Sequence, residues 1–564
     1  MNPIINGYIQ FHEKDIKDFP LKVFEDIGDE YTELDDDMDS TKFGIVNLKT
    51  EKTNLINKKM AILFSLDNSA SMSDDCIDGR TKIKHATHTI VNILRLFAET
   101  KNIECIVGMI VFNHDVTQLF EFIEIKPGKL LDETIQKIEQ IYPTSCTNIE
   151  ESLVNAKNVL DEYKEKHPYD KIVHIQLTDG DATEGETNPD ILNKHVSDKY
   201  INIFVGFGSE HNSILLQKLA SKKKGEYVFV DKIENAGLVY GEIIHNLLYP
   251  AFEEGYIEIN NGEIYDWINN IWVNRLEIPA ISSDNTKIYH IRSTNPDETS
   301  CKLYGMTAIS EDNSIKLLDE IAILPSLIST ENEEDEYILN DFTEYMYRQK
   351  VQEILYKINI LNYESLESTN PTQVDPFNTP RKKHRKTNHC NEDKKVIMRN
   401  NVKTLFQSMN EYKKNLENMV FPDEQKIKFV KVLMDDIYIA YKTIGLKKSH
   451  MYSCARQRSQ GRQCTYNVTN IEEDIVHGSP VLSTPSRLKR TYTLFERSIS
   501  NNPYDHEFVF DMDHHDEPDD KANIGLLNPL DINIDEDNFE LSQNTETSYA
   551  TPTILKLMRC VSEK

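Results

Sequence analysis

From Lys58 to about residue 250, short apolar runs alternate with amphipathic stretches, and this alternation limits the possible folds more than any other feature of the sequence. Residues 58–67, KKMAILFSLD, are almost continuously apolar, which is typical of a strand buried on both faces. Residues 81–99 follow with apolar side chains near helical spacing and are predicted to form an amphipathic helix. The same alternation predicts strands over 103–112, 116–123, 171–179, 201–208 and 226–230, and helices over 130–141, 148–163, 189–200, 213–223 and 234–249.

Strands that alternate with helices are joined by right-handed crossovers, which produce a mostly parallel sheet with helices on both faces. The runs 103–112 and 116–123 are separated by too few residues for a crossover, so they are predicted to form an antiparallel pair at one edge. The sequence therefore predicts an α/β fold for residues 58–250: a Rossmann-like domain with one antiparallel edge strand.

The rest of the chain has a different pattern. Short β-branched and aromatic runs separated by turn residues predict a small antiparallel β-rich unit over 251–330. The other expected parts are an N-terminal segment (1–57) with a strand in FGIVNLKTE, a helical segment (331–368), a linker (369–396), a helical hairpin (397–450) and a polar, acidic, partly disordered C-terminal region (451–564) that ends in a short docking helix over TPTILKLMRCVS.

Polar side chains stand where the buried strands of the 58–250 unit end. Asp67, Ser69 and Ser71 follow the first strand, Thr147 opens a helix, and Asp179 ends the strand 171–179. Ligands of open parallel sheets bind beyond the carboxyl ends of the strands, so these five residues are expected to converge. Two carboxylates and three hydroxyls suit a hard cation such as Mg²⁺, with Mn²⁺ or Ca²⁺ as alternatives.

A purely structural interpretation of these five residues stays open. In that interpretation Ser69, Ser71 and Thr147 only cap helices, and Asp179 only starts a turn. The nearby acidic residues Asp74, Asp75 and Asp78 indicate a solvated loop, with a second cation site as the alternative.

The order DNSAS, then SCTN, then LTDG resembles the von Willebrand factor A family and its metal-ion-dependent adhesion site. All five positions of that site match, at Asp67, Ser69, Ser71, Thr147 and Asp179. The resemblance implies that the serines and Thr147 touch the metal and that the aspartates act directly or through water. The whole chain, rich in Asn, Ile and Asp, also resembles A-domain proteins of giant DNA viruses.

Charge, cysteine content and apolar segments limit the classes of partner and the cellular compartment that are expected for this chain. The formal net charge of −30 argues against a general nucleic-acid binder. The eight cysteines form no C-x-x-C pair, the N-terminus shows no signal-peptide pattern, and no apolar stretch is long enough for a membrane span, so an intracellular, cytoplasmic protein is expected. Residues Arg381–Lys386 are either a solvated linker, a nuclear localisation signal or a patch for an acidic partner.

The sequence predicts a binding protein and not an enzyme, because it carries no phosphate-binding loop, no H-E-x-x-H and no G-x-S-x-G motif. The expected partner is a protein that presents an Asp or Glu side chain to the cation. One alternative is an adaptor or scaffold in a ubiquitin-type modification pathway, although the unpaired cysteines argue against an intrinsic ligase. A metal-dependent hydrolase is the weakest alternative, since it would need a base beside the metal.

Overall fold

The computed structural model describes residues 5–19, 40–52, 59–76, 79–101, 103–168, 171–208, 211–230, 236–306, 315–324, 340–367, 384–446, 449–464, 549 and 551–562. Within these ranges, no helix combines the length and the apolar character that a membrane crossing requires. Seven of the cysteines, Cys76, Cys105, Cys146, Cys301, Cys454, Cys464 and Cys560, are free thiols.

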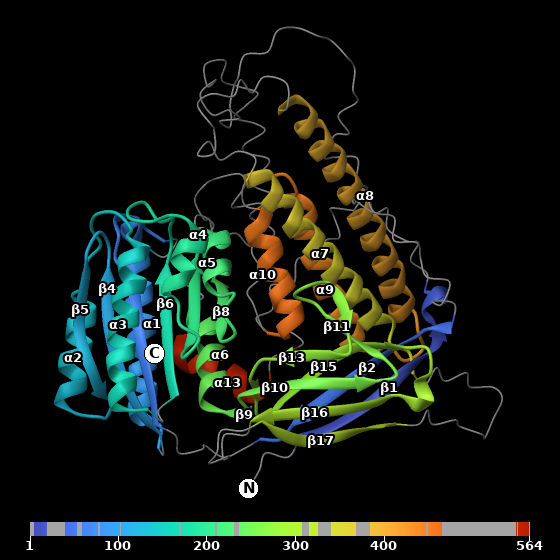
Figure 1. Ribbon diagram of the computed structural model, residues 1–564, viewed down its shortest axis with the longest axis horizontal. Helices are drawn as coiled ribbons and strands as arrows, with labels where there is room; N and C mark the ends of the chain where they lie inside the picture. Colours follow the sequence, from blue (N-terminus) through green and yellow to red (C-terminus); the bar gives the residue numbers. More distant parts are fainter. Residues whose placement is uncertain are drawn as a thin grey trace. The chain divides into compact units, whose positions relative to one another are not determined.

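The predicted α/β domain contains a six-stranded sheet with the order β5-β4-β3-β6-β7-β8 (Figure 1). All neighbouring pairs are parallel except β4 and β5, which form the expected antiparallel edge. The strands are β3 (Lys59–Asp67), β4 (Glu104–Phe112), β5 (Val116–Glu124), β6 (Lys171–Thr178), β7 (Ile201–Phe207) and β8 (Gly225–Val230).

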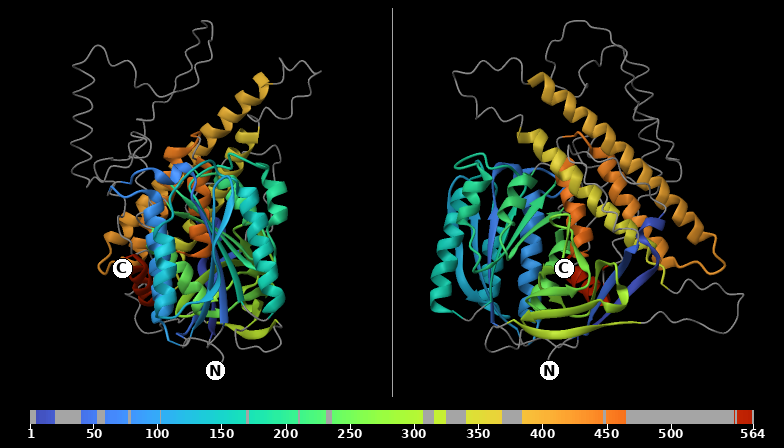
Figure 2. Two further views of the ribbon diagram at one scale, coloured as in Figure 1. Left: turned by 90° about the vertical axis from the view of Figure 1, so that its left-hand side faces the viewer. Right: turned by 45° about the vertical axis from the view of Figure 1, so that its right-hand side comes forward.

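Helices cover both faces of this sheet, as the left view of Figure 2 shows. Successive residues of a strand point to opposite faces, so Ile62 and Phe64 pack with α1, α2 and α6, whereas Ala61 and Leu63 pack with α3. The helices are α1 (Lys82–Glu99), α2 (Lys129–Glu139), α3 (Ile149–Lys166), α4 (Pro189–Leu192), α5 (Ser213–Leu219) and α6 (Ala236–Leu248).

The helix predicted over 189–200 is wrong beyond its first turns. Helix α4 ends at Leu192 and is followed by a single 3-10 turn, Asn193–His195. Val196 is extended, and the hydroxyl of Ser197 accepts a hydrogen bond from the backbone N–H of Lys199. Such local side-chain bonds compete with the helix, while Val196 and Tyr200 are still buried and so imitate a helical apolar pattern.

The β-rich unit is larger than predicted, because the N-terminal segment forms part of it. Its nine strands have the order β12-β11-β15-β2-β1-β17-β16-β10-β13, with β1 and β2 in the middle. The sheet is mixed and not antiparallel throughout, since β1 pairs with β17 in parallel. The strands are β1 (Ile5–Asp15), β2 (Lys42–Thr50), β10 (Glu254–Asn260), β11 (Glu263–Asp266), β12 (Ile271–Val273), β13 (Arg275–Ile278), β15 (Asn285–Ser293), β16 (Ser300–Met306) and β17 (Lys316–Ile323), and a separate pair is formed by β9 (Pro250–Phe252) and β14 (Ile281–Ser282).

The helical region also differs from its prediction at two places. Helix α8 begins at His384, inside the expected linker, and α10 lies at the start of the region expected to be polar and disordered. The helices are α7 (Thr343–Glu367), α8 (His384–Glu417), α9 (Glu424–Thr443), α10 (Ser449–Arg462) and α13 (Pro552–Ser562). The acidic part of the C-terminal region and residues 381–383 lie outside the described residues.

The expected docking helix at the end of the chain is present as α13. Its side chains Met558 and Val561 are buried, and Val561 belongs to the same apolar core as α1 and α6. The amide of Asn92 in α1 donates to the carbonyl of Val561 at 2.9 Å. Helix α13 is therefore a part of the α/β domain that is distant from it in sequence.

Candidate metal centre

The five predicted site residues meet at the carboxyl ends of β3 and β6. Asp67 is the last residue of β3, and Asp179 follows the last residue of β6, its parallel neighbour. Ser69 directly precedes the 3-10 turn Ala70–Ser73, Ser71 lies within it, and Thr147 precedes α3. The structure thus brings together five residues that span more than a hundred positions of the sequence.

Asp67 is fully buried and anchors the site. Its Oδ1 accepts the backbone N–H of Ser69 at 2.8 Å, and its Oδ2 accepts the hydroxyl of Thr178 at 2.6 Å. Burial raises the pKa of the Asp67 carboxyl to about 6, and the hydrogen bonds from Ser69 and Thr178 oppose that rise. The ionised form of Asp67 consequently gains from any positive charge placed beside it.

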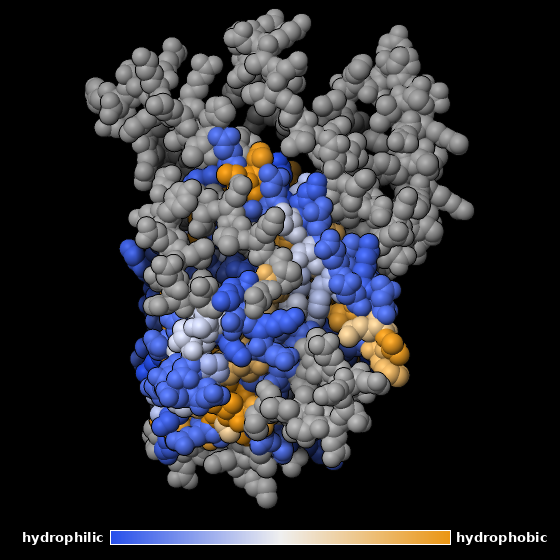
Figure 3. All heavy atoms as spheres, turned by 90° about the vertical axis from the view of Figure 1, so that its right-hand side faces the viewer, coloured by the Kyte–Doolittle hydropathy of each residue, from blue (hydrophilic) through white to orange (hydrophobic). Residues whose placement is uncertain are grey.

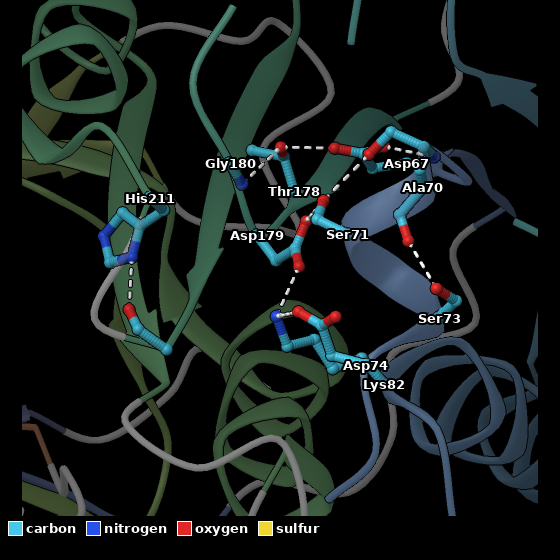
Figure 4. A network of polar contacts seen from close by, with 12 residues as sticks. Asp67, Ala70, Ser71, Ser73, Asp74, Lys82, Thr178, Asp179, Gly180 and His211 are labelled. Atoms are coloured by element: carbon cyan, nitrogen blue, oxygen red, sulfur yellow. Dashed lines mark hydrogen bonds and ion pairs between the residues drawn. The ribbon is translucent and has the colours of Figure 1, made fainter. Parts of the chain in front are cut away.

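Ser69 and Ser71 link the carboxylates of Asp67 and Asp179, and Figure 4 shows the contact of Ser71 with Asp179. The Oγ atoms of Ser69 and Ser71 are 3.2 Å apart, and the hydroxyl of Ser71 donates to Oδ1 of Asp179 at 2.7 Å. Ser73 points away from this chain and donates to the carbonyl of Ala70 at 2.7 Å. The turn therefore directs one serine into the cluster and the next one out of it.

Thr147 faces the same volume from the loop before α3. Its backbone N–H donates to the hydroxyl of Thr183 at 2.8 Å, and its carbonyl accepts the N–H of Thr183 at 2.9 Å, so its position is fixed by the loop after β6. A Cβ added to Gly180 would lie 3.8 Å from Oγ of Ser71 and 4.0 Å from Oγ1 of Thr147. The absence of a side chain at Gly180 therefore leaves room between these two hydroxyls.

Lys82, at the first position of α1, was not predicted to be part of the site. Its Nζ lies 2.8 Å from Oδ2 of Asp179 and 2.8 Å from Oδ2 of Asp74 (Figure 4). Burial disfavours the ammonium charge, but Asp179 and then Asp74 outweigh that effect and raise the pKa of Lys82. No sequence motif indicated the contact of Lys82 with Asp179. Thr178, which binds Asp67, could have been predicted, because it belongs to the LTDG motif and stands directly before Asp179.

The hydroxyl groups of Ser69 and Thr147 do not cap helices, as the purely structural interpretation of these residues would require. Ser69 is the N-cap of the 3-10 turn but makes no side-chain cap hydrogen bond. The cap of α3 is Asn148, whose side chain accepts the N–H of Glu151, and not Thr147. Thr147 is buried, and its position is fixed through its backbone and not through a cap made by its side chain.

These observations fit a hard divalent cation. The donors are all oxygen, the set combines two buried carboxylates with neutral hydroxyls, and the hydroxyl of Thr147 is turned toward the space beside Gly180. Among the described residues there is no group of three or more His, Cys, Asp or Glu side chains arranged for a metal ion. Asp78, one of the residues of the alternative second cation site, lies outside the described residues, and Asp74 is paired with Lys82.

Comparison with known proteins agrees with this fold. The profile of the von Willebrand factor type A domain matches residues 61–241. The inter-alpha-trypsin inhibitor heavy chain H3 of Mus musculus is 26% identical over 216 residues, which are 37% of this chain and 23% of that protein. The heavy chain H4 of Homo sapiens is 29% identical over 171 residues, which are 29% of this chain and 17% of that protein.

These matches span less than a quarter of the length of either relative. Among solved structures, a von Willebrand factor type A protein from Catenulispora acidiphila aligns with 10% identity and a TM-score of 0.43, over 74% of this chain and 89% of that one. Domains of this family typically mediate protein–protein interaction and commonly bind a divalent metal at the adhesion site. Residues 61–241 of the chain therefore form a domain of the von Willebrand factor type A family.

Proposed function

We propose that this domain binds a partner protein through a divalent cation held by Asp67, Ser69, Ser71, Thr147 and Asp179. The observation that carries the proposal is the convergence of these five oxygen-bearing side chains at the carboxyl ends of β3 and β6, with Gly180 leaving room between Ser71 and Thr147. Mg²⁺ is the proposed ion because it prefers hard oxygen ligands, and Mn²⁺ and Ca²⁺ are the alternatives.

The protein residues have separate tasks in this proposal. Asp67 is held rigid by Ser69 and Thr178, and Asp179 by Ser71 and Lys82, so the carboxylates are positioned before a ligand arrives. When bound, a divalent cation supplies a Lewis-acidic position that accepts one more oxygen ligand. An Asp or Glu side chain of a partner is the group whose charge and oxygen chemistry fit that position best.

The rim of the site offers a second contact for the partner. Tyr142 lies in the loop before Thr147, its side chain is 72% exposed, and its carbonyl accepts the amide of Asn68 at 3.3 Å. Tyrosine combines a large apolar area with a polar end and is common among the residues that contribute most to protein interfaces. We propose that Tyr142 packs against the partner beside the acidic residue.

Affinity capture with a matched pair of serine variants tests this function. The full chain, Ser71→Ala and Ser73→Ala are each immobilised, and bound proteins are compared in Mg²⁺ and in EDTA. Ser71→Ala and EDTA are expected to remove the same bound proteins, whereas Ser73→Ala retains them, because Ser73 faces away from the site. Partners held equally in EDTA and by Ser71→Ala would contradict a metal-dependent mechanism.

The captured partner then gives a second test. Substituting its Asp and Glu residues singly by Asn and Gln is expected to identify one carboxylate whose loss weakens binding at least tenfold. Binding that depends on no single carboxylate would contradict the proposed mode of recognition, even if the cation were required.

A further inference from the structure

Lys82 occupies a position that the helix itself does not favour. It is the first residue of α1, and no acidic residue stands in the first turn of that helix. The N-terminal end of a helix carries partial positive charge, so a lysine there is electrostatically unfavourable unless another group compensates. The compensation comes from Asp179, whose side chain is 1% exposed, and from Asp74, whose side chain is 61% exposed.

The two oxygens of Asp179 have different partners. Oδ1 accepts the hydroxyl of Ser71 at 2.7 Å, and Oδ2 is 2.8 Å from the Lys82 ammonium. Oδ1 therefore faces the hydroxyl cluster, while Oδ2 is engaged on the opposite side. A cation in the cluster shares the charge of Asp179 with Lys82 and does not have that charge to itself.

We propose that Lys82 is a built-in cation of this site that weakens the binding of the divalent ion and strengthens the binding of the anionic ligand. This inference rests on the proposed function. In their ionised forms, the carboxylates of Asp67 and Asp179 and the ammonium of Lys82 together carry one net negative charge, so a divalent ion brings the cluster to one net positive charge. Asp74 offsets this less, because its exposed carboxylate is screened by water.

A loaded site with surplus positive charge attracts a carboxylate. Without Lys82, the same ion would be fully neutralised by Asp67 and Asp179, and a further anion would gain less. Lys82 therefore lowers the affinity for the metal and directs the loaded site toward acidic partners. A lysine that served only to hold the loop in place would have the opposite effect on the metal, since its removal would loosen Asp179.

Titration calorimetry with Mg²⁺ separates these two roles. Lys82→Met is compared with Lys82→Arg, which keeps the charge, and with Lys84→Met, which removes an exposed lysine two residues further along α1. Lys82→Met is expected to bind Mg²⁺ roughly tenfold more tightly, as follows from removing one unit charge near the ion in a partly exposed site. The other two variants are expected to stay within about threefold of the unaltered chain, well under the roughly tenfold change expected for a lost charge.

The anion arm uses acetate as the probe. Acetate is titrated into the Mn²⁺-loaded protein, and the loss of Mn²⁺-induced water-proton relaxation reports displacement of metal-bound water. Lys82→Met is expected to need several-fold more acetate than the unaltered chain, while Lys84→Met needs the same amount. Lys82→Gln provides a second neutral variant if Lys82→Met does not fold.

The outcomes distinguish this inference from the proposed function. An unaltered chain that binds neither Mg²⁺ nor Mn²⁺ would overturn both. An unaltered chain that binds Mg²⁺, together with a folded Lys82→Met that binds it equally or more weakly, would overturn only the role assigned to Lys82.

Discussion

At the scale of single residues, the site is a balance between buried negative charge and the groups that stabilise it. Asp67 is fully buried next to Asp179, and its carboxylate accepts hydrogen bonds from Ser69 and from the hydroxyl of Thr178. Burying a charge without a full complement of partners is costly. The metal-free site therefore holds Asp67 at a cost in stability that a cation would remove.

This cost predicts a pH dependence. The pKa of Asp67 is raised from 3.8 to about 6 in the folded chain, so the folded state binds a proton more tightly than the unfolded state between these values. The contribution of Asp67 to stability is complete below about pH 4 and is lost as the pH rises through about 6, by on the order of 3 kcal/mol without metal. Because Mg²⁺ favours ionised Asp67, the rise in melting temperature caused by Mg²⁺ is expected to be larger at pH 7.5 than at pH 5.

Thermal melts in Mg²⁺ and in EDTA at the two pH values measure this difference, with Asp67→Asn as the control. The control has no carboxyl to titrate, and its melting temperature is expected to respond weakly to Mg²⁺ at both pH values. An equal response of the unaltered chain at pH 5 and pH 7.5 would contradict the charge balance described for Asp67.

Gly180 gives a second prediction at this scale. The Cβ of Gly180→Ala would meet Ser71 and Thr147 only at ordinary contact distances of 3.8 and 4.0 Å, so the fold is expected to tolerate it with little change in melting temperature. The added methyl group would nevertheless fill space between the two hydroxyls. It is expected to weaken Mg²⁺ binding about tenfold or more, which is the loss of affinity typical when the surroundings that orient metal ligands are changed. Calorimetry and a thermal melt on the same sample check both halves; unchanged Mg²⁺ affinity would place the ion elsewhere.

The sequence was informative about the site because two of its residues, Asp67 and Asp179, stand where buried strands end, and such strands are visible as apolar runs. Lys82 was missed for the opposite reason. Its contact with Asp179 joins residues 97 positions apart, and nothing near Lys82 distinguishes it from other surface lysines. Asp67, Ser69, Ser71, Thr147 and Asp179 were brought together as expected, and their role as metal ligands stays a prediction.

At the scale of secondary-structure elements, the close approach of α6 and α13 depends on two glycines one helical turn apart. A Cβ on Gly241 would lie 2.4 Å from Cα of Met558, and a Cβ on Gly237 would lie 2.7 Å from Cα of Ser562. The backbones are therefore in direct contact, and α13 completes the apolar core that α1 and α6 share.

This packing predicts that one substitution in α6 lowers the stability of the chain when α13 is present and raises it when α13 is removed. Gly241→Ala is expected to destabilise the full chain by about 1–3 kcal/mol, because the methyl group collides with the backbone of α13. In a chain truncated after residue 548, the same substitution is expected to stabilise by about 0.5–1 kcal/mol, since alanine is the better helix former. Urea denaturation of the four proteins measures both effects, and stabilisation in both backgrounds would show that α13 does not pack on α6.

Prediction from sequence was uneven among the elements. The strands and helices between Lys59 and Leu248 were largely identified, since the spacing of apolar residues within each of them is typical of a buried strand or an amphipathic helix. Helix α10 was missed because its buried side chains include Arg456, Gln457 and Gln460, which give no apolar stripe. Those polar groups are buried because other elements provide partners, such as Asp436 for Gln460 at 2.6 Å, and partners of that kind are not visible in a local pattern.

At the scale of the whole molecule, the N-terminal strands connect distant parts of the sequence. Strand β2 pairs with β1 on one side and with β15 on the other, where Asn285–Ser293 align with Thr50–Lys42. Residues 1–57 were predicted to be a separate segment. The pairing partners of its two strands in the rest of the chain are more than 230 residues away, and such distant pairing does not change the local pattern of apolar residues. The chain therefore enters the β-rich unit, forms the A domain and then returns to complete the first sheet.

Cleavage of the chain tests this arrangement. A protease site inserted between β2 and β3 releases an N-terminal fragment that the structure places in the centre of a nine-stranded sheet. The fragment is expected to stay bound to the rest of the chain during gel filtration, because its strand β1 pairs with β17 and its strand β2 pairs with β15. A fragment that elutes alone, with the remainder still folded, would show that the segment is independent after all.

Fourteen large apolar side chains of the described residues are exposed, and most of them are far apart in the sequence. On the face drawn in Figure 3, the coloured residues are mainly hydrophilic, and the apolar ones form small separate groups. The most exposed run is at the turn between α8 and α9, where Met419, Val420 and Phe421 are 55%, 87% and 89% exposed. Recognition through a cation and an acidic side chain accords with such a surface, because it needs no extensive apolar interface.

The most direct test of the central proposal is to locate the ion. Crystals of the full chain soaked in Mn²⁺ are expected to give one strong anomalous difference peak among Ser69, Ser71 and Thr147, at about 2 Å from their hydroxyl oxygens, as for a hard octahedral ion. The peak should disappear in crystals of Ser71→Ala and persist in crystals of Ser73→Ala. No peak between these hydroxyls in a well-ordered crystal, or a peak only at exposed carboxylates elsewhere, would contradict the proposed metal centre.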